Sequence, residues 1–211
     1  DGFLFDLGIS SHQIDSGHRG FSYMKSNDLD MRFDSKSSLT AKKFLKTISH
    51  EKLIELIQIY AELGNAKKIA KKIIQMRDNN KMNTTFDLKN AIFQALDGCS
   101  NKIISRVFQA IRIAVNDEIN TLKKTLEIIP RYLNKGGRIA IISFHSIEDR
   151  ITKHFLKNNL IMNEKNYYKP KSLGEKFKFN LITKKPLIPT EKEIKINSRS
   201  RSAKLRVAEL L

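Results

Sequence analysis

Two short apolar runs far apart in the chain constrain its fold more than any other feature. Residues 2–7 read GFLFDL, and residues 138–144 read RIAIISF after a Gly-Gly turn. Both runs are nearly continuous rather than alternating, which is typical of strands buried on both faces of a parallel sheet. The sequence therefore predicts an α/β fold with these two runs as strands of its sheet.

The residues between the two runs predict a long loop and then a block of helices. Residues 8–34 are rich in Gly, Ser and Asp, so we expect an irregular loop that is too long to be idle in a compact domain. From residue 40 to residue 96, apolar side chains recur at spacings of three and four, as in amphipathic helices. A further long helix is expected over residues 102–133, with a break or kink at Pro130.

The order of these elements predicts an α/β domain interrupted by an all-helical insertion. We expect residues 1–35 and 106–211 to form the α/β domain and residues 36–105 to form the insertion. The apolar residues of the long helix that we expect in the core lie at helical spacing: Phe108, Ile111 and Val115.

The chain after the second apolar run predicts one more helix and two more strands. Residues 146–159 have helical periodicity, and Ser146 with Asp149 has the spacing of a capping box, so we expect Ser146 to cap this helix. Residues 177–183 and 204–211 alternate in hydrophobicity and are suited to closing the sheet.

The charge balance indicates a polyanionic partner. The chain has 39 Lys and Arg residues against 22 Asp and Glu residues, a net charge of +17 and a pI near 9.9, which favours nucleic acid. Its one cysteine, Cys99, excludes a disulfide framework and a Cys-rich zinc site. There is no apolar run of about 18 residues and no basic, signal-like start, so we expect a soluble, cytoplasmic protein without a membrane partner.

The basic residues fall into groups with different expected roles. Four cationic residues crowd a short segment beside a predicted strand, with Ser and Asn between them, and we expect them to contact phosphates: Arg199, Arg201, Lys204 and Arg206. Tyr167 and Tyr168 lie in a Lys-rich stretch where they either stack on a base or cover a sheet edge, and we favour the covering role. Four lysines share one face of an amphipathic helix and are expected to be solvated: Lys67, Lys68, Lys71 and Lys72.

Polar residues follow both apolar runs, where ligands bind in an open α/β sheet. Asp6, Ser10 and Gln13 follow the first run, and His145 and Ser146 follow the second. Each cluster also has a purely structural interpretation. The carboxylate after the first run is equally typical of a helix cap or a turn, and the histidine and serine are equally typical of a satisfied loop and a cap.

No metal site, P-loop or nucleophile elbow is predicted. The five histidines are scattered, and the nine glycines never form a GxGxxG pattern. A metal-dependent hydrolase built on His145, Glu148 and Asp149 has little support, because consecutive carboxylates on a helix point apart.

Several segments stand out in order along the chain: DLGISSHQID, RGFSYM, DLDMRFD, TAKKFL, FQAIRIAVNDEI, GGRIAIISFHSIEDR and NSRSRSAKLRVAE. They resemble the successive signatures of the RsmH (MraW) family, over nearly the whole chain. Members of that family are S-adenosylmethionine-dependent methyltransferases that modify the N4 atom of a cytosine in the decoding, P-site region of 16S rRNA.

The resemblance implies a Rossmann-like methyltransferase domain with an inserted helical domain, S-adenosylmethionine as cofactor and 16S rRNA of the small ribosomal subunit as partner. It places two cofactor-binding positions on Asp6 and Gln13, and Asp6 is also the candidate catalytic residue. Candidate substrate and RNA contacts are Ser10, His145, Ser146, Arg199, Arg201 and Lys204. The family pattern commonly has Pro where this chain has His12.

Family members also carry, before the strand at residues 2–7, a further part of the methyltransferase domain with a Gly-rich loop and a ribose-binding carboxylate. We therefore expect this chain to lack the N-terminal strands of the family domain. The alternative function for such a chain is a non-catalytic module that binds RNA or assists ribosome assembly.

Overall fold

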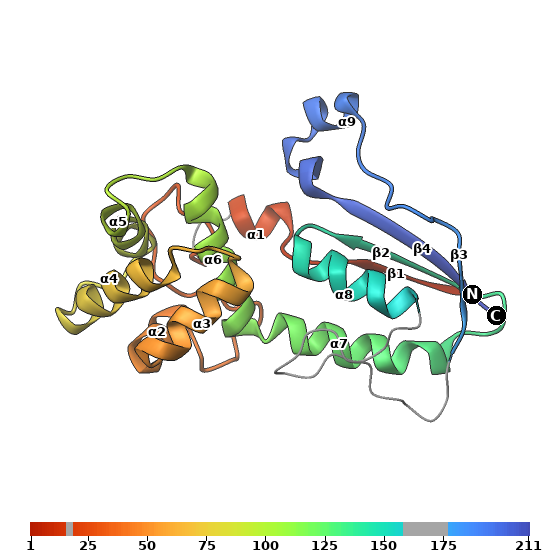
Figure 1. Cartoon of the computed structure of the whole chain (residues 1–211), viewed down its shortest axis with the longest axis horizontal. Helices are drawn as coiled ribbons and strands as arrows, with labels where there is room; N and C mark the ends of the chain where they lie inside the picture. The colour runs from red at the N-terminus through yellow and green to blue at the C-terminus, as the bar shows by residue number, and fades with distance from the viewer. Residues whose placement is uncertain (16–18, 158–176) are drawn as a thin grey trace. The chain divides into compact units, whose positions relative to one another are not determined.

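The computed structural model of the chain describes residues 1–15, 19–157 and 177–211 (Figure 1). It shows a mixed α/β protein with one sheet and many helices, as the two apolar runs predict. None of the helices within these ranges is long and apolar enough to cross a membrane. Tyr167 and Tyr168 lie outside the described residues.

Contacts divide the chain into two compact units. Asp1–Gly8 and Ile119–Leu211 form one, which we call the sheet unit, and Ile9–Glu118 forms the other, which we call the helical unit. The predicted insertion, residues 36–105, lies entirely within the helical unit, and its limits as a domain stay a prediction.

Among its described residues, the sheet unit has four strands in the order β1-β2-β4-β3. β1 (Gly2–Asp6) and β2 (Arg138–Ser143) pair in parallel and coincide with the two apolar runs. β4 (Lys204–Leu210) pairs antiparallel with β2, and β3 (Phe179–Leu181) pairs antiparallel with β4. The two alternating stretches therefore do extend the sheet, as expected from their patterns.

The first apolar run is not buried on both faces, and that expectation was wrong. Leu4 is 70% exposed, because β1 is the edge strand of the described sheet and its side chains alternate between a covered and an open face. On the covered face Ile139 and Ile141 are fully buried, and α8 (Ser146–Leu156) packs against β2 and β4. An apolar run that continues on both faces needs cover on both, and the described residues cover only one.

The helical unit has the helices that the apolar spacing predicts. They are α2 (Ala41–Thr47), α3 (His50–Tyr60), α4 (Ala66–Asp78), α5 (Thr85–Ala95) and α6 (Asn101–Asn116). Their inward faces form one core, whose fully buried members include Leu45, Leu53, Ile57, Ile69, Ile73, Leu88, Ile92 and Ile111. The predicted core residues of the long helix are buried as expected: Phe108, Ile111 and Val115.

The described part of the loop predicted over residues 8–34 is irregular except for one short helix, α1 (Ser11–Asp15). The long helix predicted over residues 102–133 breaks earlier than Pro130. α6 ends at Asn116, its capping residue Asp117 has a left-handed φ of 49°, and α7 (Glu118–Ile128) begins immediately afterwards.

Pro130 does not interrupt α7. It lies in the first turn of the 3-10 helix η1 (Ile129–Tyr132), where the missing amide hydrogen of proline leaves no bond unmade. Two further elements that the sequence did not predict precede β4, namely α9 (Glu191–Ile196) and the 3-10 helix η2 (Ser198–Ser202).

Candidate functional site

Asp6 lies at the carboxyl end of β1, where the parallel pair ends. Its neighbour Leu7 still donates to the carbonyl of Ile142 at 3.0 Å, and Gly8 then turns the chain with a φ of 90°. The side chain of Asp6 is exposed, and its carboxylate forms no hydrogen bond or ion pair with any described residue. No described residue thus occupies this carboxylate, and ligands of α/β proteins bind at such strand ends. Its predicted roles toward cofactor and substrate stay predictions.

His145, at the end of the second strand, caps α8. Its backbone is extended, with φ −140° and ψ 164°, and its Nδ1 atom accepts a hydrogen bond from the amide of Glu148 at 3.4 Å. The Glu148 carboxylate accepts from the amides of Phe144, at 2.9 Å, and His145, at 3.3 Å, which completes a capping box.

The predicted cap, Ser146 with Asp149, was therefore wrong by one residue. Ser146 is the first residue of the helix itself, so its hydroxyl is not placed to cap the helix start. Histidine is an uncommon cap, and the preference for serine at such positions led the prediction one residue too far.

His145 and Glu148 form a closely packed pair. The Nε2 atom of His145 lies 3.2 Å from Oε1 of Glu148, and their side chains are only 8% and 5% exposed. The side chain of His145, which is predicted to contact substrate, is therefore already engaged in holding the start of α8. Its role toward substrate stays a prediction. The sequence analysis did not predict that Glu148 takes part in this cap, although the spacing of three between the histidine and the glutamate is the spacing of a capping box.

Asp149 joins α8 to β4. Its carboxylate accepts from Nε of Arg206 at 2.7 Å and from Nζ of Lys204 at 3.2 Å. Burial acts to raise the pKa of Asp149, but the hydrogen bonds and positive charges of Arg206 and Lys204 outweigh it and hold that pKa below its usual range. The side chain of Lys204 is still 41% exposed, so this candidate RNA contact is both paired and open to solvent. Arg206 is only 8% exposed, so the expectation that it contacts phosphate was wrong: its guanidinium is turned inward to the carboxylate of Asp149.

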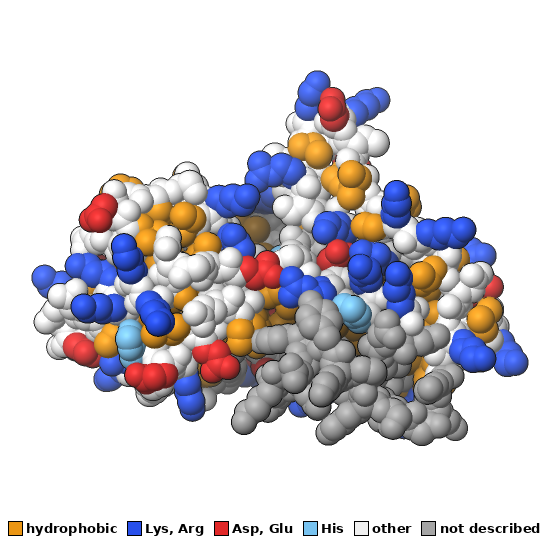
Figure 2. Space-filling view, in the orientation of Figure 1, with side chains coloured by type: hydrophobic (Ala, Val, Ile, Leu, Met, Phe, Trp, Pro, Cys, Tyr) orange, Lys and Arg blue, Asp and Glu red, His pale blue; other side chains and the backbone are white. Residues whose placement is uncertain are grey.

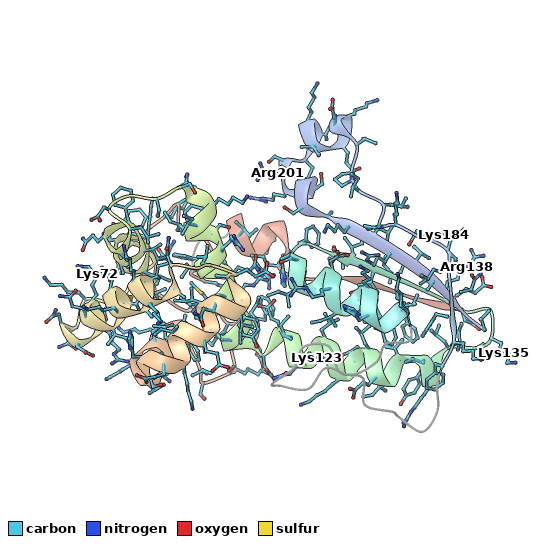
Figure 3. All side chains as sticks on the ribbon, in the orientation of Figure 1. Lys72, Lys123, Lys135, Arg138, Lys184 and Arg201 are labelled. Carbon is cyan, nitrogen blue, oxygen red and sulfur yellow. The ribbon has the colours of Figure 1, made fainter. Side chains whose placement is uncertain are left out.

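The candidate phosphate contacts Arg199 and Arg201 lie in η2, immediately before β4, and both are exposed. The side chain of Asn197 caps this 3-10 helix by accepting from the amide of Arg199 at 3.1 Å. Arg201, labelled in Figure 3, forms no hydrogen bond or ion pair with the described residues. The structure thus brings the predicted cationic residues together on one continuous segment.

Other lysines and arginines are spread over the visible face (Figure 2). On α4 they occupy the face opposite the buried Ile69 and Ile73, as predicted, and Lys72 is labelled among them in Figure 3. This is the ordinary arrangement of an amphipathic surface helix.

Ser10 and Gln13 belong to the helical unit, where they bond to each other. The amide of Ser10 donates to Oε1 of Gln13 at 3.0 Å, and the amide of Gln13 donates to Oγ of Ser10 at 3.2 Å. This reciprocal pair is a capping box, and it explains why a helix interrupts the predicted loop. The predicted roles of Ser10 toward substrate and of Gln13 toward cofactor stay predictions.

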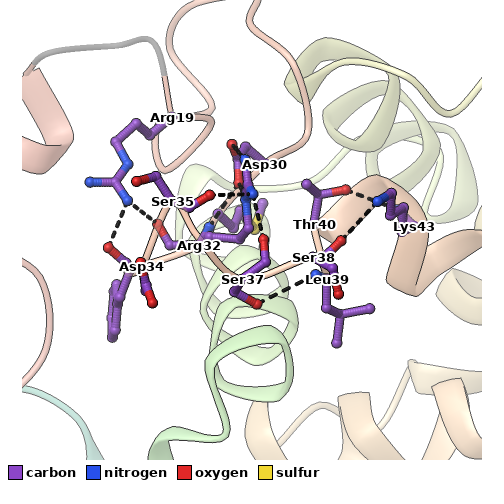
Figure 4. A network of polar contacts seen from close by, with 12 residues as sticks. Arg19, Asp30, Arg32, Asp34, Ser35, Ser37, Ser38, Leu39, Thr40 and Lys43 are labelled. Atoms are coloured by element: carbon purple, nitrogen blue, oxygen red, sulfur yellow. Dashed lines mark hydrogen bonds and ion pairs between the residues drawn. The ribbon is translucent and has the colours of Figure 1, made fainter.

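The DLDMRFD segment carries a polar network that the sequence did not predict (Figure 4). The guanidinium of Arg32 donates from Nε and Nη2 to the carboxylate of Asp30 at 2.6 and 2.7 Å. The hydrogen bond from Arg32 is the main reason why the pKa of Asp30 lies below its usual range. Nη2 of Arg19 donates to the carbonyls of Arg32 and Phe33, both at 2.7 Å.

Met31, in the middle of this segment, has a left-handed backbone with a φ of 59° although its side chain is buried. Its amide donates to the carbonyl of Arg19 at 2.8 Å, and its carbonyl accepts from Nδ2 of Asn116 at 2.7 Å. Oδ1 of Asn116 also accepts from the amide of Phe33 at 2.6 Å. Such a conformation is costly for a bulky residue and persists because the surrounding bonds fix it.

No cluster of three or more His, Cys, Asp or Glu side chains that could hold a metal ion occurs among the residues that the structure describes. Of the predicted site residues, Ser10 and Gln13 belong to the helical unit and the others to the sheet unit.

Comparison with known proteins finds a match over the whole chain. The model of the MraW methylase family matches residues 1–211. The chain is 46% identical to "Ribosomal RNA small subunit methyltransferase H" of Caldicellulosiruptor saccharolyticus, over 99% of this chain and 69% of that protein. It is 44% identical to the protein of that name from Halothermothrix orenii, with the same coverage, and 46% identical to the one from Amoebophilus asiaticus, over 99% of this chain and 67% of that protein.

Proposed function

Because the chain belongs to the MraW methylase family, we propose that it methylates the N4 atom of a cytosine in the decoding region of 16S rRNA, with S-adenosylmethionine as methyl donor. The names of its relatives, methyltransferases of small-subunit ribosomal RNA, support the reaction class and the kind of substrate. The family resemblance supports the cytosine, the N4 atom and the P-site location. The fold proposed with this function is a Rossmann-like methyltransferase domain with an inserted helical domain.

The structural observation that supports this proposal is the position of Asp6. Its exposed carboxylate, without a described partner, lies at the carboxyl end of a parallel strand pair, where α/β proteins bind ligands. A carboxylate in this place fits S-adenosylmethionine, because it accepts hydrogen bonds from the ammonium group of the cofactor and favours a positive charge nearby. When bound, the cofactor supplies a methyl group that is already activated by its sulfonium.

The chain's own contribution to the reaction is mainly alignment. The lone pair of the cytosine amine is delocalised into the ring, so the amine reacts only when held in line at about 3 to 3.5 Å from its target. An acceptor for one of its hydrogens, for which Asp6 is the candidate, favours the pyramidal nitrogen of the transition state. The base must leave its stack to reach such a site, and cationic contacts to neighbouring phosphates hold the RNA meanwhile.

We propose that the segment of η2 and β4 supplies those cationic contacts through Arg199, Arg201 and Lys204. The first two are exposed, and Lys204 remains partly open beside Asp149. The net charge of +17 also supports the alternative function, a non-catalytic RNA-binding module. Calorimetric titration of the protein that the whole gene encodes with S-adenosylmethionine separates the two, because only the enzyme requires that ligand.

The test of the proposed function is methylation in cells. A strain without the gene is supplied with the wild-type gene, with Asp6→Asn or with Glu127→Gln, an exposed carboxylate on α7 that serves as the matched control. Mass spectrometry of 16S rRNA digests is expected to show N4-methylcytidine with the wild-type and control genes and none with Asp6→Asn. Methylation by Asp6→Asn within about threefold of wild type, which corresponds to about 0.65 kcal/mol, contradicts the role of Asp6. Methylation at that cytosine without the gene contradicts the function itself.

A further inference from the structure

The helical unit contains a small cavity of about 270 Å³. Most of its wall comes from four of the signature segments, DLGISSHQID, RGFSYM, DLDMRFD and FQAIRI, and Ser105 of α6 completes it. None of the residues that line the cavity has a role in the proposed methyl transfer at Asp6. All of the residues that line the cavity belong to the helical unit, so the cavity is a property of that unit alone.

Aromatic rings form much of the wall. Phe21, Tyr23 and Phe108 all line the cavity, and the rings of Tyr23 and Phe108 meet edge to face with their centroids 5.7 Å apart. Phe21 is held in turn against Phe33, at 5.8 Å between centroids. A flat ligand can therefore lie against fixed ring faces without rearranging them.

Polar side chains enter the cavity from one stripe of α6. Ser105, Gln109 and Arg112 follow each other at spacings of four and three, so they share a face of that helix. Neither the half-buried amide of Gln109 nor the hydroxyl of Ser105 is bonded to any described residue. An amide in this setting offers one acceptor and two donors to a ligand.

Arg112 is held in place by an ion pair that leaves one of its nitrogens without a described partner. Its Nε and Nη2 atoms donate to the carboxylate of Glu118 at 2.8 and 2.9 Å, and both side chains are about nine-tenths buried, with 12% and 10% exposed. The other terminal nitrogen, Nη1, forms no hydrogen bond with the described residues. Arg112 can therefore offer the two hydrogens of Nη1 to a ligand, beside the unbonded side-chain amide of Gln109.

The remaining wall is rigid as well. Met31 lines the cavity in its left-handed conformation, and bonds to Arg19 and Asn116 fix its backbone on both sides. Strained residues that are held in place in this way concentrate at binding sites, where they shape a surface before the ligand arrives.

From these observations we infer that the cavity binds one unpaired nucleobase of the RNA. Its volume lies near the lower end of small-molecule pockets, about 300 Å³, which suits a single ring system rather than a longer ligand. Rings that stack and side chains that read a hydrogen-bonding edge are the two means by which proteins hold splayed bases. The choice of RNA as ligand rests on the proposed function, whereas the site itself rests on the geometry.

Fluorescence titration of the 211-residue chain tests this inference. The probe is a pentaribonucleotide of uridines with 2-aminopurine at its centre, whose emission falls when the base stacks on an aromatic ring. The wild-type chain is expected to quench it. Gln109→Leu, which keeps the size of the side chain and removes its hydrogen bonds, is expected to weaken binding about fivefold or more, the lower range of one base contact.

Gln94→Leu on α5 is the matched control, because Gln94 is exposed, lies in the same unit and does not line the cavity. It is expected to bind as wild type does. Tyr23→Leu is the second variant, and it is expected to reduce the quenching because it removes a ring from the wall. Thermal melting of each variant confirms that the helical unit remains folded.

Two results overturn the inference: a probe that is not quenched by the wild-type chain, or a Gln109→Leu variant that binds as tightly as Gln94→Leu. Neither result depends on methyl transfer. If the cavity variants bind the probe as the control does while rRNA methylation depends normally on the gene, the base site alone is refuted. If the cavity variants weaken binding of the probe but the cytosine of 16S rRNA is methylated without the gene, the proposed function alone is refuted.

Discussion

Asn116→Ala removes the side chain that joins α6 to the DLDMRFD segment. In the structure, Asn116 accepts from the amide of Phe33 at 2.6 Å and donates to the carbonyls of Met31 and Arg112 at 2.7 and 2.9 Å. The first two bonds bridge residues more than 80 positions apart in sequence, so no neighbouring residue can replace them.

The expected cost follows from the groups that the substitution leaves unpaired. The amide of Phe33 and the carbonyl of Met31 each lose a partner, at about 1 to 3 kcal/mol for a buried group and at the lower end for the half-buried ones here. Alanine is the better helix former by roughly 0.5 kcal/mol, which offsets part of this loss. We expect the free energy of unfolding to fall by about 2 kcal/mol.

Urea unfolding of the purified chain measures this change, with the slope of the transition as the check that both variants unfold alike. Asn90→Ala is the control, because Asn90 is an exposed helical asparagine of the same unit without a hydrogen bond to the described residues. Hydrogen exchange at the amide of Phe33 should accelerate in Asn116→Ala only. A loss of stability within about 0.5 kcal/mol of that of Asn90→Ala refutes the reasoning.

Three further perturbations have defined outcomes. Asp97→Gly should stabilise the chain by about 0.5 to 1 kcal/mol in thermal melting, whereas Asp97→Ala should not, because the φ of 51° suits glycine. Asp149→Asn should lower the free energy of unfolding at pH 7 by on the order of 2 kcal/mol. Because the pKa of Asp149 is lower in the folded state, this difference should shrink as the pH falls below about 4 through that lowered pKa; a pH-independent difference contradicts the ion pair. The combined substitutions Arg199→Glu, Arg201→Glu and Lys204→Glu should reduce the slope of log affinity for rRNA against log salt concentration by roughly 0.7 to 0.9 per lost phosphate contact. An unchanged slope excludes this segment as a phosphate-binding surface.

The elements of this fold were largely predictable because they depend on local apolar spacing. The runs at residues 2–7 and 138–144 became β1 and β2, and the three-four spacing after residue 40 became the helices of the helical unit. In each case, the pattern of one segment is sufficient, since its inward side chains are set by helical or strand geometry alone.

The predictions that failed depend on residues far away in the sequence. The break between α6 and α7 falls at Asp117, which has no Gly or Pro signal and takes its left-handed conformation directly after the residue that bonds to Met31 and Phe33. The exposure of Leu4 depends on which faces of the sheet are covered, which its own run does not encode. Sequence spacing cannot supply such information.

The candidate site shows the same division. The position of Asp6 could be predicted because a carboxylate that ends an apolar strand is a local pattern, and the structure shows it exposed at the strand end; its role as a site residue stays a prediction. Asn116 and Glu148 were missed as bonding residues. Their partners are backbone amides and carbonyls, which every residue possesses and which therefore leave no mark in the sequence.

The signature residues of the chain separate into two chemical groups, and the division indicates where ligand chemistry resides. Asn116 and Asp149 have their polar atoms occupied by bonds that join distant segments within one unit, so binding a ligand through them would cost those bonds. The side chains of Asp6, Gln109 and Arg201 are bonded to none of the described residues, so a ligand can engage them without breaking a bond inside the protein. A substitution of the first group should therefore lower stability and activity together. One of the second group should lower activity or binding while the melting temperature stays unchanged.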